Sequence, residues 1–311
     1  MQQPDTNIFF FKGDSSMKLE KDLYAIDKTL LVKAGEPINK KKLQHIAALS
    51  KKISYKQIKD TWMMKDLVKT FEDKRYTNIL YPPQTNQKII RSISRVKMPE
   101  KILAELAYMK ELTYYTYQHI LVISILSSKV SFDYSQRSHY MPEMAMMLSL
   151  FHDLGKSRIP LNILDKPTPI TMQERQILSS HPLIGYVLLH YYFGKDHGKY
   201  SFSSFQHHER LDGSGYPLGI KTLNKYSKLI GVVDALDALI SERPYRTSPF
   251  TLRAAIDLLL IDSEKGKFHK GIVRTLVAYS RREMPSSKLV VAKIGRDKEP
   301  AGNSYGITAE S

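Results

Sequence analysis

Two short stretches of this 311-residue chain carry most of its chemically capable side chains. They are His152-Asp153-Leu154-Gly155-Lys156 and the run HHERLDGSGYP from His207 to Pro217. Adjacent His-Asp and His-His pairs pack poorly into an apolar core but bind hard or borderline metal ions well. The glycines in both stretches allow sharp turns and the close approach of a substrate. The two stretches therefore predict a metal centre.

Composition limits the ligands and the class of protein. The chain has no cysteine, which excludes disulfides and thiolate sites, so a metal must be bound by His, Asp, Glu or water. A hydrophobic content of 42% indicates a globular protein. The net charge of +16 attracts anions such as nucleic acids, acidic lipids or nucleotides, although solvated surface lysines explain it equally well. With no apolar run near ~20 residues and no signal-peptide pattern, we expect a cytoplasmic protein without a transmembrane segment.

The remaining candidate ligands lie on predicted helices. The first helix follows Pro99 and places one face of side chains at intervals of three and four: Leu112, Tyr115, His119, Val122, Ile123 and Leu126. A second helix runs from about Pro142 to Gly155 and carries His152 and Asp153 near its end. A third begins at Thr171, with Glu174 at capping-box spacing, and Pro182 sets a kink or boundary at His181. A fourth, Leu229 to Ile240, carries Asp234 in apolar surroundings, and a fifth runs from Ser248 to about Ile261.

Each of these residues also has an ordinary structural explanation. His119 alone fits a buried core histidine, and His181 and Lys156 fit helix-end residues. On a helix, the side chains of His207 and His208 diverge by roughly 100°, so both bind one cluster only at the helix edge, unless one is structural. Several carboxylates and imidazoles in apolar settings within one chain nevertheless favour a shared metal site over separate coincidences.

Residues 1–95 differ from the rest and predict a small α+β module. Leu30 to Ile38 is typical of a strand with a turn at Gly35, and Asn39 to Leu49 of a short helix that buries Leu43, Ile46 and Ala47. The prolines in Tyr81-Pro82-Pro83 predict a linker zone over 74–98. We therefore expect a module at 1–95, a helical domain at 96–285, and a partly disordered tail at 286–311 with one short strand at Leu289–Ile294.

The ordered motifs resemble the HD-GYP branch of the HD superfamily of metal-dependent phosphohydrolases. The resemblance covers roughly residues 110–282. It rests on His119 and on the following stretches: His152 to Lys156, Ile159-Pro160, Ile163 to Pro167, His181 to Gly185, His207 to Pro217, Val233 to Leu239, and Arg243-Pro244-Tyr245-Arg246. It implies a mainly α fold, an HD-type helical bundle preceded by the small α+β module.

The resemblance also implies roles for single residues. One metal would take His119, His152, Asp153 and Asp234, and Asp153 would bridge to a second held by His181, His207 and His208. Two divalent ions, iron or manganese, would hold a bridging hydroxide as nucleophile. Lys156 would act with Asp153 in catalysis, and the substrate would contact Arg243, Arg246, Gly215 and Tyr216, although either arginine alone also fits a solvated surface residue. Glu209 and Asp212 would orient the ligands and the loop.

The implied activity is hydrolysis of cyclic di-GMP to linear pGpG, with GMP as a further product. Tyr115 stands where some members have a glutamate ligand, which favours two metals over three, and Thr247 and Phe268-His269-Lys270 also depart from the family pattern. These departures motivate an alternative, a weakly active or inactive signalling module that binds cyclic di-GMP or a partner protein. A third reading is an HD hydrolase of another nucleotide. A diguanylate cyclase or another signalling protein is the expected protein partner, and nucleic acid is a distant alternative.

Overall fold

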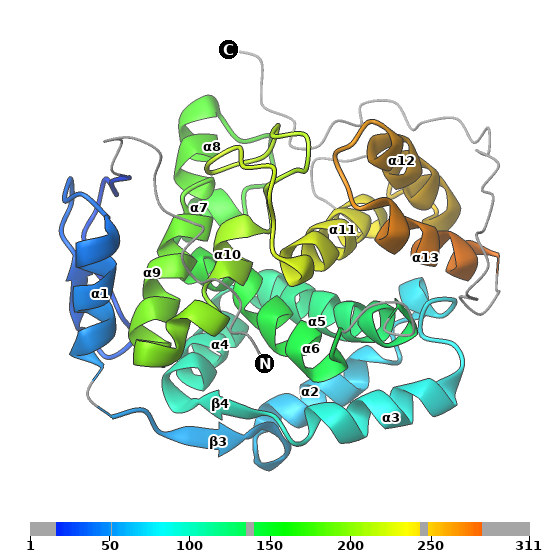
Figure 1. Ribbon diagram of the computed structural model, residues 1–311, viewed down its shortest axis with the longest axis horizontal. Coiled ribbons are helices and arrows are strands. Elements are labelled where there is room, and N and C mark those ends of the chain that lie inside the picture. Colours follow the sequence, from blue (N-terminus) through cyan, green and yellow to red (C-terminus); the bar gives the residue numbers. More distant parts are fainter. Residues whose placement is uncertain (1–16, 51, 135–139, 243–247, 282–311) are drawn as a thin grey trace.

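The computed structural model describes residues 17–50, 52–134, 140–242 and 248–281, which form the mainly α molecule of Figure 1. Short strands, helices and 3-10 helices (η) come first: β1 Leu23–Tyr24, β2 Leu30–Val32, α1 Lys40–Leu49, β3 Tyr55–Gln57, η1 Ile58–Asp60, α2 Trp62–Thr70, η2 Lys74–Tyr76, α3 Pro83–Ile93 and β4 Lys97–Pro99. The helical part follows: α4 Glu100–Leu112, α5 Tyr114–Tyr134, α6 Pro142–His152, η4 Leu154–Arg158, α7 Leu161–Leu164, α8 Met172–Leu178, α9 His181–Phe193, η5 Gly194–Lys199, α10 Phe202–Gln206, α11 Lys225–Ile240, α12 Leu252–Glu264 and α13 Lys270–Ser280. The predicted fold class is confirmed.

Helix α5 lies at the centre of the helical part, where α4, α6, α11 and α13 pack against it (Figure 1). Residues 119–131 are buried without interruption, so this helix has no solvent-facing side over most of its length. The predicted single helix across Leu112 is wrong, because α4 ends there and α5 begins at Tyr114. Leu112 and Tyr115, expected on the buried face, are each 45% exposed.

The N-terminal elements form the small α+β region predicted from the sequence. Strand β1 pairs with β2 and β3 with β4, both antiparallel, and Tyr55 lies opposite Pro99. Helix α1 packs against α9, α2 against α5, and α3 against both α5 and α6 (Figure 1). Leu67 of α2 and Ile89 of α3 belong to the same continuous apolar cluster as Ile123 of α5. The N-terminal region therefore shares its core with the helical part.

Two local predictions in this region have different outcomes. Helix α1 is confirmed: the Asn39 side chain caps it by accepting from the backbone N–H of Lys42, and it buries Leu43, Ile46 and Ala47. The linker predicted over 74–98 is wrong, because it contains α3. Pro83 occupies the first turn of that helix, where a missing N–H costs nothing, and Thr85, Ile89 and Ile93 follow at intervals of four on its buried face.

Helix ends position several of the candidate ligands. Helix α9 begins at His181, as Pro182 predicted, and Thr171 and Glu174 form the expected capping box of α8. Helix α6 ends at His152, three residues before the predicted Gly155, and the chain tightens into η4. Gly155 permits this, because a Cβ there would lie 2.0 Å from the carbonyl oxygen of His181. Helix α12 begins at Leu252 with Thr251 as its cap, later than the predicted Ser248.

Within the parts of the chain that the structure describes, no helix combines the length and apolar character needed to span a membrane. The short strand expected at Leu289–Ile294 and the tail at 286–311 lie outside the described residues. The divisions expected at residues 95 and 285 stay predictions.

Candidate metal centre

Five helices bring the seven predicted ligands together. His119 lies inside α5, His152 ends α6 and Asp153 follows it, His181 begins α9, His207 and His208 follow α10, and Asp234 lies inside α11. All seven are buried except His208, which is partly buried. Residues from 119 to 234 thus converge on one point in the interior of the helical part.

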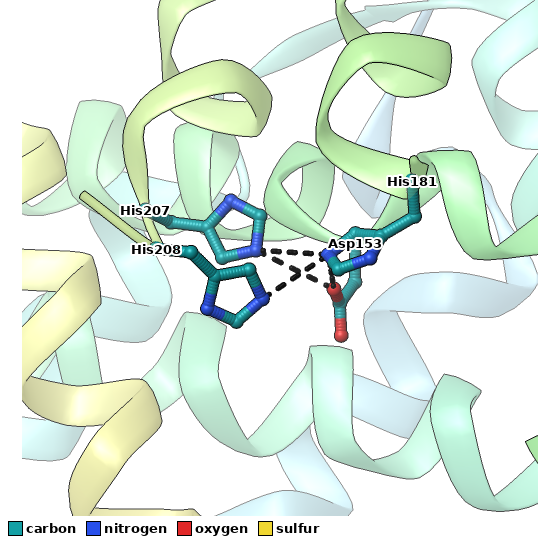
Figure 2. A group of neighbouring side chains, drawn as sticks. All are labelled: Asp153, His181, His207 and His208. Carbon is teal, nitrogen blue, oxygen red and sulfur yellow. Dashed lines mark hydrogen bonds and ion pairs between the residues drawn. The ribbon is translucent and has the colours of Figure 1, made fainter. Parts of the chain in front are cut away.

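One group of side chains surrounds the Oδ1 atom of Asp153, as Figure 2 shows. The Nε2 atoms of His181 and His207 lie 3.2 Å and 3.6 Å from this oxygen. His208 completes the group, with its Nε2 atom 3.2 Å from Nε2 of His181. The candidate ligand atoms of these four residues lie within 4.8 Å of one another, close enough to share one ion.

A second group surrounds the other oxygen of the same carboxylate. The Nε2 atoms of His119 and His152 lie 3.6 Å and 3.4 Å from Asp153 Oδ2. Asp234 joins from α11, with its Oδ1 atom 3.2 Å from His119 Nε2. Asp153 therefore stands between two groups and presents one oxygen to each.

The orientation of the imidazoles fits cation binding. The Nδ1 atoms of His152, His181 and His207 each lie 2.6–2.7 Å from the backbone carbonyl oxygen three residues earlier, which only accepts hydrogen bonds. The proton of each neutral ring therefore sits on Nδ1, and the Nε2 lone pair points toward Asp153. Lone pairs and a carboxylate that converge in a buried space repel one another unless a cation lies between them.

Among the proposed ligands in the described part of the chain, two buried atoms have no hydrogen-bond partner: Nε2 of His152 and Oδ1 of Asp153. They belong to different groups, and a ligand in each group would satisfy them. Nitrogen and carboxylate oxygen donors suit iron or manganese, and thiolates are absent from the chain. The residues therefore fit a divalent metal in each group.

The electrostatics favour a cation as well. Burial disfavours charge on Asp153, but Lys156 and the surrounding histidines outweigh it and hold the pKa of this carboxyl well below its usual range. Burial lowers the pKa of His207 to about 4 and lowers that of His181 and His208, so these rings are neutral at pH 7. His119 differs: despite burial, Asp234 and Asp237 raise its pKa to about 9. The carboxylates around His119 thus favour a positive charge at this position.

Lys156 and the loop from Gly213 to Pro217 (the glycine loop) border this centre. The Nζ atom of Lys156 donates to Asp153 Oδ2 at 2.6 Å, and its side chain is 21% exposed. The Tyr216 ring stacks on His208 with 4.6 Å between the ring centroids. A Cβ on Gly215 would lie 2.4 Å from the backbone carbonyl of His208, so only glycine lets the loop pack this closely. The loop therefore closes against the histidine pair.

The two predicted orienting carboxylates hold the loop itself. Glu209 accepts from the backbone N–H groups of Leu218 and Ile220 at 2.7 Å and 3.1 Å. Asp212 accepts from the backbone and hydroxyl of Ser214. Arg243 and Arg246 lie outside the described residues, as do the Pro244 and Tyr245 of their motif and Thr247. Tyr115, at the position considered for a third metal, donates its hydroxyl to the carbonyl of Glu242 at 3.2 Å.

Two residues without a predicted role also reach the site, although Asp237 belongs to the family motif from Val233 to Leu239. Asp237 Oδ2 lies 2.6 Å from His119 Nδ1, and the Tyr76 hydroxyl donates to the other oxygen of Asp237. The spacing of three from Asp234 places Asp237 on the same side of a helix, which was a usable signal. Tyr76 carried none, because it precedes His119 by 43 residues and lies in the zone predicted as a linker.

Comparisons with known proteins match part of this chain to a domain family and to several enzymes. Residues 142–269 match the family model described as HD domain. The chain is 37% identical over 115 residues to the cyclic di-GMP phosphodiesterase response regulator RpfG of Xanthomonas campestris pv. campestris, covering 36% of this chain and 30% of that protein. It is 32% identical over 156 residues to a cyclic di-GMP phosphodiesterase of Thermotoga maritima, covering 50% and 41%. It is 27% identical over 170 residues to the 3'3'-cGAMP-specific phosphodiesterase 1 of Vibrio cholerae, covering 54% and 38%. The chain thus spans less than half the length of these relatives.

Proposed function

We propose, on the premise that the chain carries an HD domain of the HD-GYP family, that it is a metal-dependent phosphodiesterase that hydrolyses cyclic di-GMP to pGpG. The family prediction itself is confirmed by the match at residues 142–269 and by the relatives. The activity rests on one observation above all. Asp153 lies between two groups of inward-facing imidazoles and presents one oxygen to each.

The two groups support the following set of ligands. His119, His152, Asp153 and Asp234 would hold one divalent ion, and Asp153, His181, His207 and His208 a second. Such ions, iron or manganese, would activate a water molecule as nucleophile and neutralise charge on a phosphodiester oxygen. The protein's part is to fix the rings, and the backbone carbonyls that accept from Nδ1 of His152, His181 and His207 do this.

Lys156 would be a cation that contacts the substrate. An ammonium group has three N–H donors, and Lys156 uses one of them on Asp153, which leaves donors for a non-bridging phosphate oxygen or the leaving group. Tyr216 and Gly215 would border the bound nucleotide on the His208 side. Arg243 and Arg246 would bind its phosphate or guanine edges.

A related substrate is the second candidate. The similarity to the 3'3'-cGAMP-specific phosphodiesterase 1 of Vibrio cholerae favours a cyclic dinucleotide with one adenine. Both substrates place the same phosphodiester chemistry at the metal centre and differ in the base that the surrounding loops must accept. Assays with both dinucleotides therefore belong in one experiment.

The test is a turnover assay on protein purified without oxygen and loaded with Fe(II) or Mn(II). We expect the full chain to convert cyclic di-GMP to pGpG, and chromatography measures the product. His152→Ala should abolish this conversion. His45→Ala removes an exposed histidine of α1 and should leave the rate unchanged. Faster turnover of 3'3'-cGAMP would select the second candidate. Binding of cyclic di-GMP without hydrolysis at full metal occupancy would show a signalling module instead.

A further inference from the structure

A chain of hydrogen bonds runs from the N-terminal region to a proposed metal ligand. The Tyr76 hydroxyl, at the end of η2, donates to Asp237 Oδ1. The other oxygen of Asp237 accepts from His119 Nδ1 at 2.6 Å. Two hydrogen bonds thus separate Tyr76 from the imidazole whose Nε2 faces Asp153 and Asp234.

The carboxylate of Asp237 is fully engaged. Asp237 is 2% exposed, and its Oδ1 atom also accepts from the Ser241 hydroxyl at 2.7 Å. Arg75 donates to that hydroxyl at 2.7 Å and places its guanidinium 3.8 Å from Asp237 Oδ1. A buried carboxylate requires such donors to offset the loss of hydration. Asp237 is consequently held in one orientation, with one oxygen reserved for His119.

The segment that carries Tyr76 is built to stay in place. Asp73 caps η2 by accepting from the backbone N–H of Arg75 and pairs with the Arg75 guanidinium at 2.6 Å. Tyr76 is only 1% exposed, and its carbonyl accepts from the backbone N–H groups of Ile79 and Leu80, both at 2.9 Å. The tyrosine ring is therefore a fixed part of the packing around α11.

We infer that Tyr76 is a positioning residue of the metal centre, acting through Asp237 to fix the ring of His119. A histidine ring turns about its last bond with broad preferences, so the Nδ1 bond to Asp237 decides where Nε2 points. Tyr76 holds that acceptor from the other side. Residues ahead of the HD domain match, which begins at residue 142, thereby complete the outer shell of the site. The inference rests on the proposed function, since it requires His119 to be a ligand.

The test measures Mn(II) affinity of the full chain by calorimetry, without reference to turnover. Outer-shell changes typically cost about 10–100-fold in metal affinity, so we expect about a 10–100-fold loss for Asp237→Asn and about tenfold for Tyr76→Phe. The loss of affinity should affect only one of the two bound ions, because His119 belongs only to the group with His152, Asp153 and Asp234. A general loss of stability would instead lower the affinity for both ions together.

Tyr279→Phe is a matched control. The Tyr279 hydroxyl donates to Asp133 at 2.5 Å, so the variant also removes a buried tyrosine–aspartate bond. Asp133 lies 14 positions after His119 on α5, about 21 Å along the helix, so this bond is remote from the site. We expect Tyr279→Phe to keep the affinity for both ions.

The outcomes separate the inference from the proposed function. If Tyr76→Phe lowers the affinity for one ion only, and Tyr279→Phe keeps the affinity for both, the inference is supported. Two ions bound normally by Tyr76→Phe overturn it and leave the proposed function standing. A wild-type chain that binds no Mn(II) overturns both. If Tyr76→Phe does not fold, Ser241→Ala, which removes the other hydroxyl on Asp237 Oδ1, must show the same selective loss, and unchanged affinity there overturns the inference.

Discussion

Histidines occur in two kinds of buried surroundings in this protein. Around Asp153, the rings of His119, His152, His181 and His207 each place Nδ1 on a hydrogen-bond acceptor and turn Nε2 toward a carboxylate. Near the end of α9, His190 donates to the Tyr186 carbonyl at 2.8 Å and contacts the tilted ring of His197, with 4.0 Å between ring centroids. The groups that shift the pKa of His190 are neutral or basic, and none is a carboxylate. Only the first environment suits a metal, although the residue type is the same.

The pKa of His190 makes it a source of acid sensitivity. Burial and the neighbouring His197 lower this pKa to about 3, whereas the unfolded chain binds the same proton near 6.5. Between these values the unfolded state holds more protons, so the free energy of unfolding rises with pH. The contribution of neutral His190 is complete above pH 6.5 and is lost as the pH falls toward 3.

Replacing the ring should therefore flatten the pH dependence of stability. For His190→Leu, we expect the difference in unfolding free energy between pH 7 and pH 5, measured by urea titration, to shrink by about 2 kcal/mol relative to wild type. Val187→Ala, a neighbouring core substitution without a titratable group, should lower stability equally at both pH values. An unchanged pH dependence in His190→Leu would contradict the assignment.

At the scale of elements, the sequence was most informative where helices end. Thr171, Glu174 and Pro182 have conformational preferences of their own, so the cap of α8 and the start of α9 at His181 could be predicted. Helix α3 was missed because a Pro-Pro pair reads as a break, although proline suits a first turn. Helix α5 is buried on all sides, so periodicity could not show which side of it faces the metal site. The first case depends on the local preference of proline, and tertiary packing decided the second.

The contact between η4 and α9 supports an element-scale prediction. A Cβ at position 155 would lie 2.0 Å from the His181 carbonyl oxygen and 2.6 Å from the backbone nitrogen of Gly185. Because both atoms are backbone, no side-chain rotation relieves the overlap, and Gly155→Ala must push η4 away from α9. We expect a loss of about 1–3 kcal/mol in stability and weaker Mn(II) binding, since Asp153 and His181 move apart. Thermal unfolding and calorimetry measure the two effects.

Gly35→Ala provides the comparison for this prediction. Gly35 has φ +72°, and no atom lies within 4 Å of the position that a Cβ would occupy, so alanine there costs about 1 kcal/mol in backbone strain only. Its Mn(II) affinity should match that of the wild type. Wild-type affinity in Gly155→Ala would show that the site tolerates separation of η4 from α9.

At the scale of the whole molecule, the N-terminal region is joined to the site at more than one place. Besides Tyr76, the Tyr24 carbonyl accepts from Nε of Arg158, which closes η4 two residues after Lys156. Arg158 forms a bidentate pair with the fully buried Glu105 of α4, at 2.9 Å and 2.5 Å. Breaking such a pair leaves a buried charge without compensation, so this pair holds η4 against α4, while the Tyr24 carbonyl joins η4 to the N-terminal region. The region ahead of α4 therefore supports both η4 and His119.

This attachment leads to a prediction for the boundary expected at residue 95. A fragment of residues 96–311 lacks α2 and α3, which contribute Leu67 and Ile89 to the core shared with α5, and it lacks Tyr76. We expect it to melt at a lower temperature than the full chain, to bind a hydrophobic dye, and to lose Mn(II) affinity. Scanning calorimetry, dye fluorescence and a Mn(II) titration measure these effects. If the fragment matched the full chain in melting temperature and affinity, residue 95 would mark an independent domain, and the support of the metal centre by the N-terminal region would be refuted.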